Sequence, residues 1–472
     1  MRLARIFVIV IVAAALVIGF VVDDRDRPIA DVTVLSASSV PVVARDGGVW
    51  FCPGGSAAGG VAEVSLELIN IGGDAATAVV AGVRSGTGED ARESTVVVEP
   101  GAREIVRLTE LVPDSAWMGA VVEVTAGQLV VEQTFIGAAL GTDRAPCDSR
   151  TSTTWISAAG ATRATEEFGE SLTLLVLNPF LDDAVLNISF DSDVGVDSMP
   201  GIVVPARRVV AVDLTTEVTV ASRVSAIIDV VSGRVAVSRL QVIDNPEQTG
   251  VAVTPASVGA APVWFIPSVD RDLRNDVITV VNPSSTETAE VDLEIVADGD
   301  QQFDPILLTV RPGRSVAVSI AAETRLEGVG AMSVVARSLT GLPIAVMNES
   351  ALSFGEGRVS NLSATSGLDA AATEWVAPVE AEAGGIVIYN PSSSSIATVH
   401  VSAMADGERV TLAPIELGPM ARAFVAAGEL GGQRPIVTIE SASPIVVGRT
   451  LSGVSLHAQL AAIAVGETEP LR

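Results

Sequence analysis

Residues that commonly carry out catalysis or bind transition metals are scarce in this chain. Its 472 residues include two His, two Cys, one Tyr and no Lys, so that all 29 basic residues are Arg. His400 and His457 are not accompanied by a Gly-x-Ser-x-Gly elbow, a His-Glu-x-x-His run or a Cys-x-x-Cys pair. The sequence therefore does not indicate a nucleophilic hydrolase or a zinc site, and we predict a non-catalytic protein without a cofactor.

Cations and aromatic side chains are also few. The formal net charge is −28, and aromatic residues make up 4% of the chain. Nucleic-acid binding requires clustered cations, so we expect no nucleic-acid partner. Apolar residues nevertheless make up 48%. The hydrophobic cores must therefore consist mainly of Val, Ile, Leu and Ala.

One long apolar run stands near the N-terminus, at residues 6–22. Arg2 and Arg5 precede it, and an acidic stretch that begins with Asp23 follows it. As a helix this run would be about 25 Å long, enough to span a bilayer core. The flanking charges favour a cytoplasmic N-terminus. We expect a single-pass signal anchor and linker in residues 1–30, with the bulk of the chain extracytoplasmic at the cell membrane; a cleaved signal peptide is the alternative.

Four markers recur in one order along the rest of the chain. A Trp opens each unit, an Asn follows, a Pro-containing turn comes next, and an apolar strand closes the unit. Successive opening Trp residues are 105 to 111 positions apart. The markers are Trp50, Trp155, Trp264 and Trp375; Asn70, then Asn178 with Pro179, Asn282 with Pro283, and Asn390 with Pro391; and Pro100, Pro205, Pro312 and Pro419.

A period of this length is typical of a small β-sandwich and too long for a propeller blade. Within each unit, short strands rich in Val, Ile and Thr are separated by Gly, Pro, Asn and Asp. We predict an all-β protein, a tandem array of four immunoglobulin-like β-sandwich repeats behind one N-terminal transmembrane helix, with a β-propeller as the alternative. The repeats are expected at residues 31–148, 149–253, 254–368 and 369–472.

Two further sets of residues are candidates for bonds or ligands. Cys52 and Cys147 bracket the first repeat, which suggests a disulfide in an exported chain; two buried free thiols are the alternative. Asp191, Asp193 and Asp197 surround Gly195 in a turn that could offer oxygen ligands to calcium. The EF-hand pattern is not met, and an acidic, solvated turn is the preferred interpretation, so no metal centre is predicted.

The order of Trp, Asn-Pro, Pro-x-x-Arg and a closing apolar strand resembles a recurrent extracytoplasmic repeat of actinobacterial proteins. The matching motifs lie at residues 174–179, 204–208 and 343–349. The closing strand carries Glu132 and Glu349 in two units, with Arg239 and Arg449 in the others. The whole chain is similar to a family of single-span actinobacterial envelope proteins of unassigned function. The resemblance implies a cellular location and a scaffold, and no activity.

Two functional hypotheses follow. The first is a membrane-anchored extracytoplasmic scaffold or binding protein of the cell envelope, which binds protein or cell-wall glycan through loops and strand edges. The second is an accessory subunit of a membrane glycosyltransferase or cell-wall enzyme with a carbohydrate-binding face. Trp117 is the one Trp outside an opening strand, and thus the candidate for sugar stacking. An enzyme with a dispersed active site is the third interpretation.

Overall fold

The computed structural model describes residues 38–472, except for 45–46, 58–59, 89–90, 138–139, 166–168, 247, 273, 300, 302, 353–359, 381–383, 406 and 453–456. The expected anchor at residues 6–22 lies outside the described residues. Among the helices that are described, none is both long and apolar enough to cross a bilayer. Residues 38–472 form one compact unit.

This unit is built almost entirely of strands, which account for 63% of the residues, against 4% in helices. Strand β12 (Ala184–Ser192) shows why: Leu186 and Ile188 are buried, whereas the intervening Asn187 is only partly covered. That alternation fits a pleated strand with one face on a core. The all-β prediction is confirmed. The described part of the chain contains neither a closed barrel nor a propeller, so the propeller alternative is not supported.

The strands fall into four consecutive segments. Segment 1 comprises β2 (Gly48–Ser56), β3 (Glu63–Asn70), β4 (Ala76–Arg84), β5 (Glu93–Val98), β6 (Arg103–Arg107), helix α2 (Leu108–Leu111), β7 (Trp117–Ala126), β8 (Leu129–Gly137) and β9 (Gly141–Pro146). Segment 2 comprises β10 (Thr154–Ser157), β11 (Gly169–Asn178), β12, β13 (Gly195–Val204), β14 (Arg208–Asp213), helix α3 (Leu214–Glu217), β15 (Val224–Ser232), β16 (Ala236–Asp244) and β17 (Thr249–Pro255).

Segment 3 comprises β18 (Val263–Val269), β19 (Val277–Asn282), β20 (Ala289–Val296), β21 (Ile306–Val310), β22 (Arg314–Ser319), the 3-10 turns η1 (Ile320–Ala322) and η2 (Thr324–Leu326), β23 (Met332–Ser338), β24 (Ala345–Leu352) and β25 (Ser360–Ser366). Segment 4 comprises β26 (Ala370–Pro378), β27 (Gly384–Tyr389), β28 (Ala397–Ala405), β29 (Glu408–Thr411), β30 (Ile415–Leu417), β31 (Arg422–Ala426), η3 (Ala427–Glu429), β32 (Ile436–Ser452), β33 (His457–Ala461), β34 (Ile463–Val465) and β35 (Glu469–Pro470).

The same strand order recurs in these segments. In segment 2, one sheet runs β10-β15-β12-β13 and the other β14-β11-β16-β17; in segment 3 the corresponding orders are β18-β23-β20-β21 and β22-β19-β24-β25. In segment 1 the two sheets follow the same order and are joined by a single pair, Ser56 with Glu63. In segment 4 the long strand β32 takes part in both sheets.

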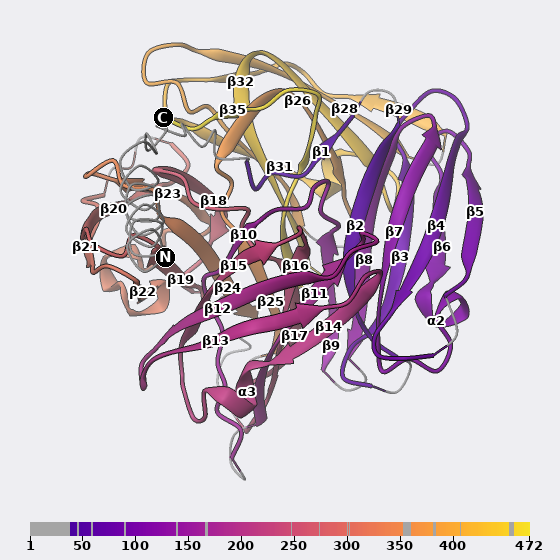
Figure 1. Cartoon of the computed structure of the whole chain (residues 1–472). Coiled ribbons are helices and arrows are strands. Elements are labelled where there is room, and N and C mark those ends of the chain that lie inside the picture. The colour runs from indigo at the N-terminus through magenta and orange to yellow at the C-terminus, as the bar shows by residue number, and fades with distance from the viewer. Residues whose placement is uncertain are drawn as a thin grey trace, which may run out of the picture. The chain divides into compact units, whose positions relative to one another are not determined.

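In each segment, the strand that follows the closing strand packs against its counterparts in other segments. Strand β17 contacts β9 and β25, and β33 contacts β25 and β9. The four strands therefore close a ring in which segment 4 meets segment 1. Figure 1 shows the segments in chain order, from indigo through magenta and orange to yellow. The strand β1 (Val42–Val43) reinforces the closure because it pairs in parallel with β34.

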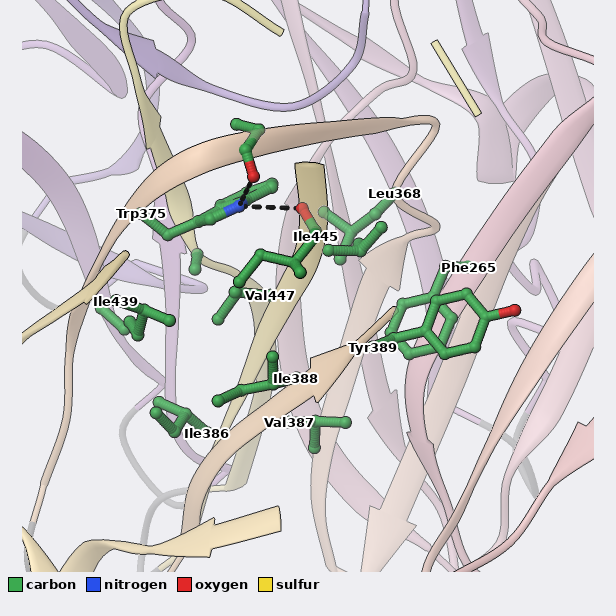
Figure 2. Packing of buried hydrophobic residues seen from close by; sticks show 14 of the residues in the cluster. Phe265, Leu368, Trp375, Ile386, Val387, Ile388, Tyr389, Ile439, Ile445 and Val447 are labelled. Atoms are coloured by element: carbon green, nitrogen blue, oxygen red, sulfur yellow. Dashed lines mark hydrogen bonds between the residues drawn. The ribbon is translucent and has the colours of Figure 1, made fainter. Parts of the chain in front are cut away.

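Hydrophobic cores lie within the segments and continue between some of them. Phe265 of segment 3 stacks on Tyr389 of segment 4 with ring centroids 4.6 Å apart and planes inclined by 10°. Figure 2 shows this pair beside Trp375 and the aliphatic residues of segment 4. Burial of such apolar surface contributes about 25 cal/mol per Å² to stability. The junction of segments 3 and 4 is thus part of a core.

Candidate functional site

The four opening Trp residues perform one structural task. Each is fully buried, and each indole N–H donates to a carbonyl at the start of the segment's closing strand or, in segment 4, to that of Ile445 within β32. The acceptors are Leu129 for Trp50, Val235 for Trp155, Ile344 for Trp264 and Ile445 for Trp375, at 2.7 to 3.1 Å. A buried indole needs such a partner. These Trp side chains are therefore part of the hydrophobic cores and offer no exposed face on which a sugar could stack. Trp117 is only partly buried, against the cores of segments 1 and 2.

The recurring Asn residues fasten a turn to a neighbouring strand. Asn282 is fully buried; its side-chain N–H₂ donates to Glu287 and Val310, and its oxygen accepts from the N–H of Ser284. Asn70, Asn178 and Asn390 make the same three kinds of bond. In the last three of the four copies, the Pro that follows ends the strand at this turn. The repeat markers thus maintain the fold and do not form a ligand site.

The remaining candidates from the sequence also have structural partners. Cys52 and Cys147 form a disulfide. Buried Asp191 accepts bonds from Arg314 and Ser315 of the next segment. Asp193 accepts from residues 222 and 223, and Asp197 from the N–H of Ser198. Across the described residues, no group of three or more His, Cys, Asp or Glu is arranged to hold a metal ion.

The Arg that follows each Pro-containing turn links its segment to the one before. Arg208 donates through Nε to Gly86 O at 3.0 Å, and Arg314 pairs with Asp191 at 2.9 Å. Arg422 donates to Ala331 O at 2.7 Å. Arg103 of segment 1 donates to Arg434 O of segment 4 at 2.9 Å, which continues the series around the ring. The same position of the repeat therefore contributes a hydrogen bond or an ion pair to each of the four junctions between segments.

A second position alternates in charge and forms ion pairs between neighbouring segments of the ring. Glu132 of segment 1 binds Arg449 of segment 4, and both side chains are fully buried. Arg239 of segment 2 binds Glu349 of segment 3 at 2.6 Å. The closing-strand residues Glu, Arg, Glu and Arg thus form two complementary pairs. Buried pairs of this kind fix a specific arrangement more than they stabilise it.

The junction of segments 1 and 4 holds a denser ionic network. Arg144 lies 3.3 Å from Glu67, 3.8 Å from Glu132 and 2.8 Å from Glu380. Burial alone would raise the pKa of Glu67, but Arg144, Arg103 and Arg434 outweigh it and lower that pKa. The pKa of Arg144 is raised because the surrounding carboxylates outweigh the effect of its burial. Glu67 and Arg144 therefore remain charged at neutral pH.

A cavity of about 40 Å³ lies where the four segments meet. Ala145 and Asp148 line it from segment 1, Thr254 from segment 2, Thr365 from segment 3 and Leu460 from segment 4. Burial raises the pKa of Asp148 well above its usual range, although Arg150 acts against this. The Oδ2 atom of Asp148 has no hydrogen-bond partner. The space is that of a few water molecules, too small for an oligosaccharide.

The larger space is a groove between segments 1 and 2, with a volume of about 600 Å³. Strands β4 and β7 form one wall, and the turns that contain Pro179 and Arg207 form the other. A volume of 300 to 1,000 Å³ is usual for small-ligand sites. Three arginines, Arg84, Arg207 and Arg208, line this groove. It is the candidate binding site, and sequence reasoning missed it because its two walls come from residues more than 50 positions apart.

Comparisons with known proteins give no assignment: no protein-family model and no curated protein matches the chain. Among solved structures, Thermotoga maritima 1070 is 16% identical over 23% of this chain and 93% of its own, with a TM-score of 0.20. Streptomyces avermitilis α-L-rhamnosidase complexed with L-rhamnose is 9% identical over 79% and 54% of the two chains, with a TM-score of 0.14. A tetra-tandem repeat from the extending region of a large adhesion protein is 12% identical over 91% and 100%, with a TM-score of 0.11. Similarities this weak carry no argument about fold or function.

Proposed function

We propose that this protein is a non-catalytic scaffold of the cell envelope, tethered by an N-terminal signal anchor and built from four immunoglobulin-like β-sandwich repeats. It binds an envelope protein or glycan on the outer side of the membrane. The observation that carries the proposal is the ring of final strands β9, β17, β25 and β33. A ring closed by buried ion pairs and turn arginines holds the loops of four sandwiches in fixed relative positions. Fixed loops on a rigid framework are the usual basis of specific binding.

The attachment of the tether supports the same function. Directly after residue 37, the N–H of Ser39 and the hydroxyl of Ser38 donate to the Asp369 carboxylate, at 2.8 to 3.0 Å. Asp369 lies next to β26 of segment 4. Ser38 and Ser39, where the described chain begins, are therefore held against Asp369 beside segment 4. A scaffold needs such a fixed mounting.

The proposal is tested by capture from the envelope. The full chain, produced with its disulfide in an oxidising compartment and solubilised in a nonionic detergent, is crosslinked to envelope material and screened on a glycan array. Specific enrichment of one envelope protein or one wall polymer is expected. Enrichment of a membrane glycosyltransferase or cell-wall enzyme would select the accessory-subunit alternative. Turnover of an envelope substrate by the purified chain would contradict a non-catalytic role.

The cellular location is tested in a separate experiment. Protease added to intact spheroplasts should digest the region after residue 38, while a tag placed before residue 6 stays protected. Protection of both ends would place the bulk of the chain inside the cell and contradict the proposal. Secretion of the whole chain without membrane retention would favour a cleaved signal peptide.

A further inference from the structure

Residues 38–43, which we call the clasp, lie where the four segments of the ring meet. They follow an irregular path that ends in the short strand β1. Ser39 and Pro41 line the central cavity together with residues of all four segments. The clasp is therefore in a position to contact every segment, although it is only six residues long.

The clasp is hydrogen bonded to each connection between consecutive segments. Between segments 1 and 2, the hydroxyl of Ser149 accepts from the N–H of Val42 at 3.1 Å. Between segments 2 and 3, the N–H of Val258 donates to the hydroxyl of Ser39 at 3.0 Å. Between segments 3 and 4, the Asp369 carboxylate accepts from Ser38 and Ser39 at 2.8 to 3.0 Å. About one repeat length separates each connection from the next.

The end of segment 4 is bound to the clasp as well. The N–H of Ala464 donates to the carbonyl of Pro41 at 3.0 Å, and that of Gly466 donates to the carbonyl of Val43 at 3.2 Å. Strand β1 thereby pairs in parallel with β34, and Figure 1 shows it in indigo beside the yellow strands of segment 4. The C-terminal end of every segment is thus bonded to the same six residues.

Two apolar side chains anchor the clasp in different cores. Val40 and Val43 are 1% and 3% exposed. Val40 belongs to the core that contains Phe265 and Trp375, whereas Val43 belongs to the core that contains Trp50. Burial of these side chains favours the bound clasp. The clasp therefore adds an apolar contact to the cores of segments 3 and 4 on one side and of segment 1 on the other.

These contacts depend on one another. Fixing six residues of irregular chain costs conformational entropy that no single hydrogen bond offsets, so the contacts form together. Release has a corresponding cost, because Asp369, Val258 and Ala464 are buried. A buried donor or acceptor that loses its partner must be reached by water or remain unsatisfied. The clasp can therefore leave only when the ends of several segments open to solvent.

We propose that the clasp binds and leaves as one unit, and that its binding locks the four segments into the closed ring. A change at one connection is transmitted through the clasp to the other connections, and its release loosens the ends of all segments together. This inference goes beyond the proposed function, since it concerns how the ring is held and is the same whatever the chain binds.

The test is hydrogen–deuterium exchange of the full chain, solubilised in a nonionic detergent with its disulfide intact and followed by mass spectrometry. Asp369→Ala removes the acceptor for Ser38 and Ser39, whereas Asp369→Asn keeps one carbonyl oxygen. The matched control is Asp193→Ala. Asp193 also accepts from a Ser hydroxyl and from backbone N–H groups, those of residues 222 and 223, but in an exposed turn of segment 2.

Asp369→Ala should accelerate exchange by about tenfold or more in the clasp. A similar acceleration is expected at residues 256–260 and 462–466, which lie at the ends of segments 2 and 4. Strand β12 should exchange as in wild type, and Asp369→Asn should show a smaller effect at the same sites. Asp193→Ala should accelerate exchange only in its own turn.

Acceleration confined to the clasp and the neighbours of Asp369 would overturn the proposal, because the other connections would then be independent of it. If Asp369→Ala unfolds, exchange of the wild-type chain in low concentrations of urea decides. The stretches around Val42, Val258 and Ala464 should then open with one common urea dependence, different from that of β12. Three different dependences would contradict release as one unit.

Discussion

The two junctions of segment 4 are built differently. Toward segment 3 it shares a hydrophobic core, in which Phe265 stacks on Tyr389. Toward segment 1 it adds an ionic network to the apolar contacts of Val376 and Ile463, with buried Arg449 on Glu132 and exposed Arg434 on buried Glu67. Segments 3 and 4 are consecutive in sequence, so the short connection between them already favours their contact over a contact with another segment. Segments 1 and 4 are joined by residues more than 300 positions apart, and wrong pairings there leave buried charges unpaired. Charge pairing therefore contributes to the closure of the ring, as it also does between segments 2 and 3, where Arg239 pairs with Glu349.

The largest effect should come from breaking the closure pair. Arg449→Met removes the hydrogen-bonded partner of buried Glu132, which keeps only the longer contact with Arg144, and should reduce the free energy of unfolding by about 3 to 5 kcal/mol. Chemical denaturation of the full chain measures this. The double variant Arg449→Met with Glu132→Leu removes both charges and should recover much of the loss. A single variant as stable as wild type would show that the pair does not hold the closure.

A smaller loss is expected at the apolar junction. Phe265→Leu removes the ring stacked on Tyr389 and part of a buried side chain, for a cost of about 1 to 3 kcal/mol. Because no charge is exposed or left unpaired, this loss should be the same at low and high salt. A strongly salt-dependent loss would mean that the two junctions are not different in kind.

Acidity should act on paired and unpaired carboxylates in opposite directions. The pKa of Glu67 is lowered in the folded state, so its stabilising contribution is present above its unfolded pKa and is lost as pH falls through the folded pKa. Glu67→Gln should therefore be costly at neutral pH and nearly neutral in acid. The unfolding midpoints of wild type and Glu67→Gln, measured between about pH 3 and 8, where carboxyl groups titrate, check this expectation.

The pKa of Asp148 is raised by burial, so the stability associated with its neutral form is present below the unfolded pKa and is lost as pH rises through the folded pKa. Asp148→Asn should match wild type in acid and become the more stable protein as pH rises. The unfolding midpoints of wild type and Asp148→Asn over the same pH range test this prediction. A difference between them that does not change with pH would contradict the burial of an ionisable Asp148 beside the cavity.

The smallest effect should come from a charge pair outside both junctions. Arg107 and Glu110 are 3.5 Å apart, with side chains 69% and 68% exposed. Such pairs contribute about 0 to 1 kcal/mol. Arg107→Ala should therefore shift the denaturation midpoint very little. A loss comparable to that of Arg449→Met would mean that burial does not explain the difference between charge pairs.

Local sequence patterns were sufficient to predict some features of the fold. Alternating Val and Ile residues predicted the strands, and the even spacing of Trp50, Trp155, Trp264 and Trp375 marked equivalent positions. The disulfide between Cys52 and Cys147 was also predicted and is present. Such features depend on neighbours in the chain or on the identity of a few residues. The groove could not be predicted, because Arg84 and Arg207 come together only through the packing of two segments.

The all-β character, the marker positions and the disulfide could be predicted from the amino-acid sequence, because strand periodicity and residue chemistry act locally. The sequence also contained the turn arginines and the alternating Glu and Arg of the closing strands, without showing what they bind. The pairing of Glu132 with Arg449, and of Arg239 with Glu349, became known from the folded chain. The physical reason is that charge pairing depends on distance in space, which the ring of four segments sets and the order of residues along the chain does not.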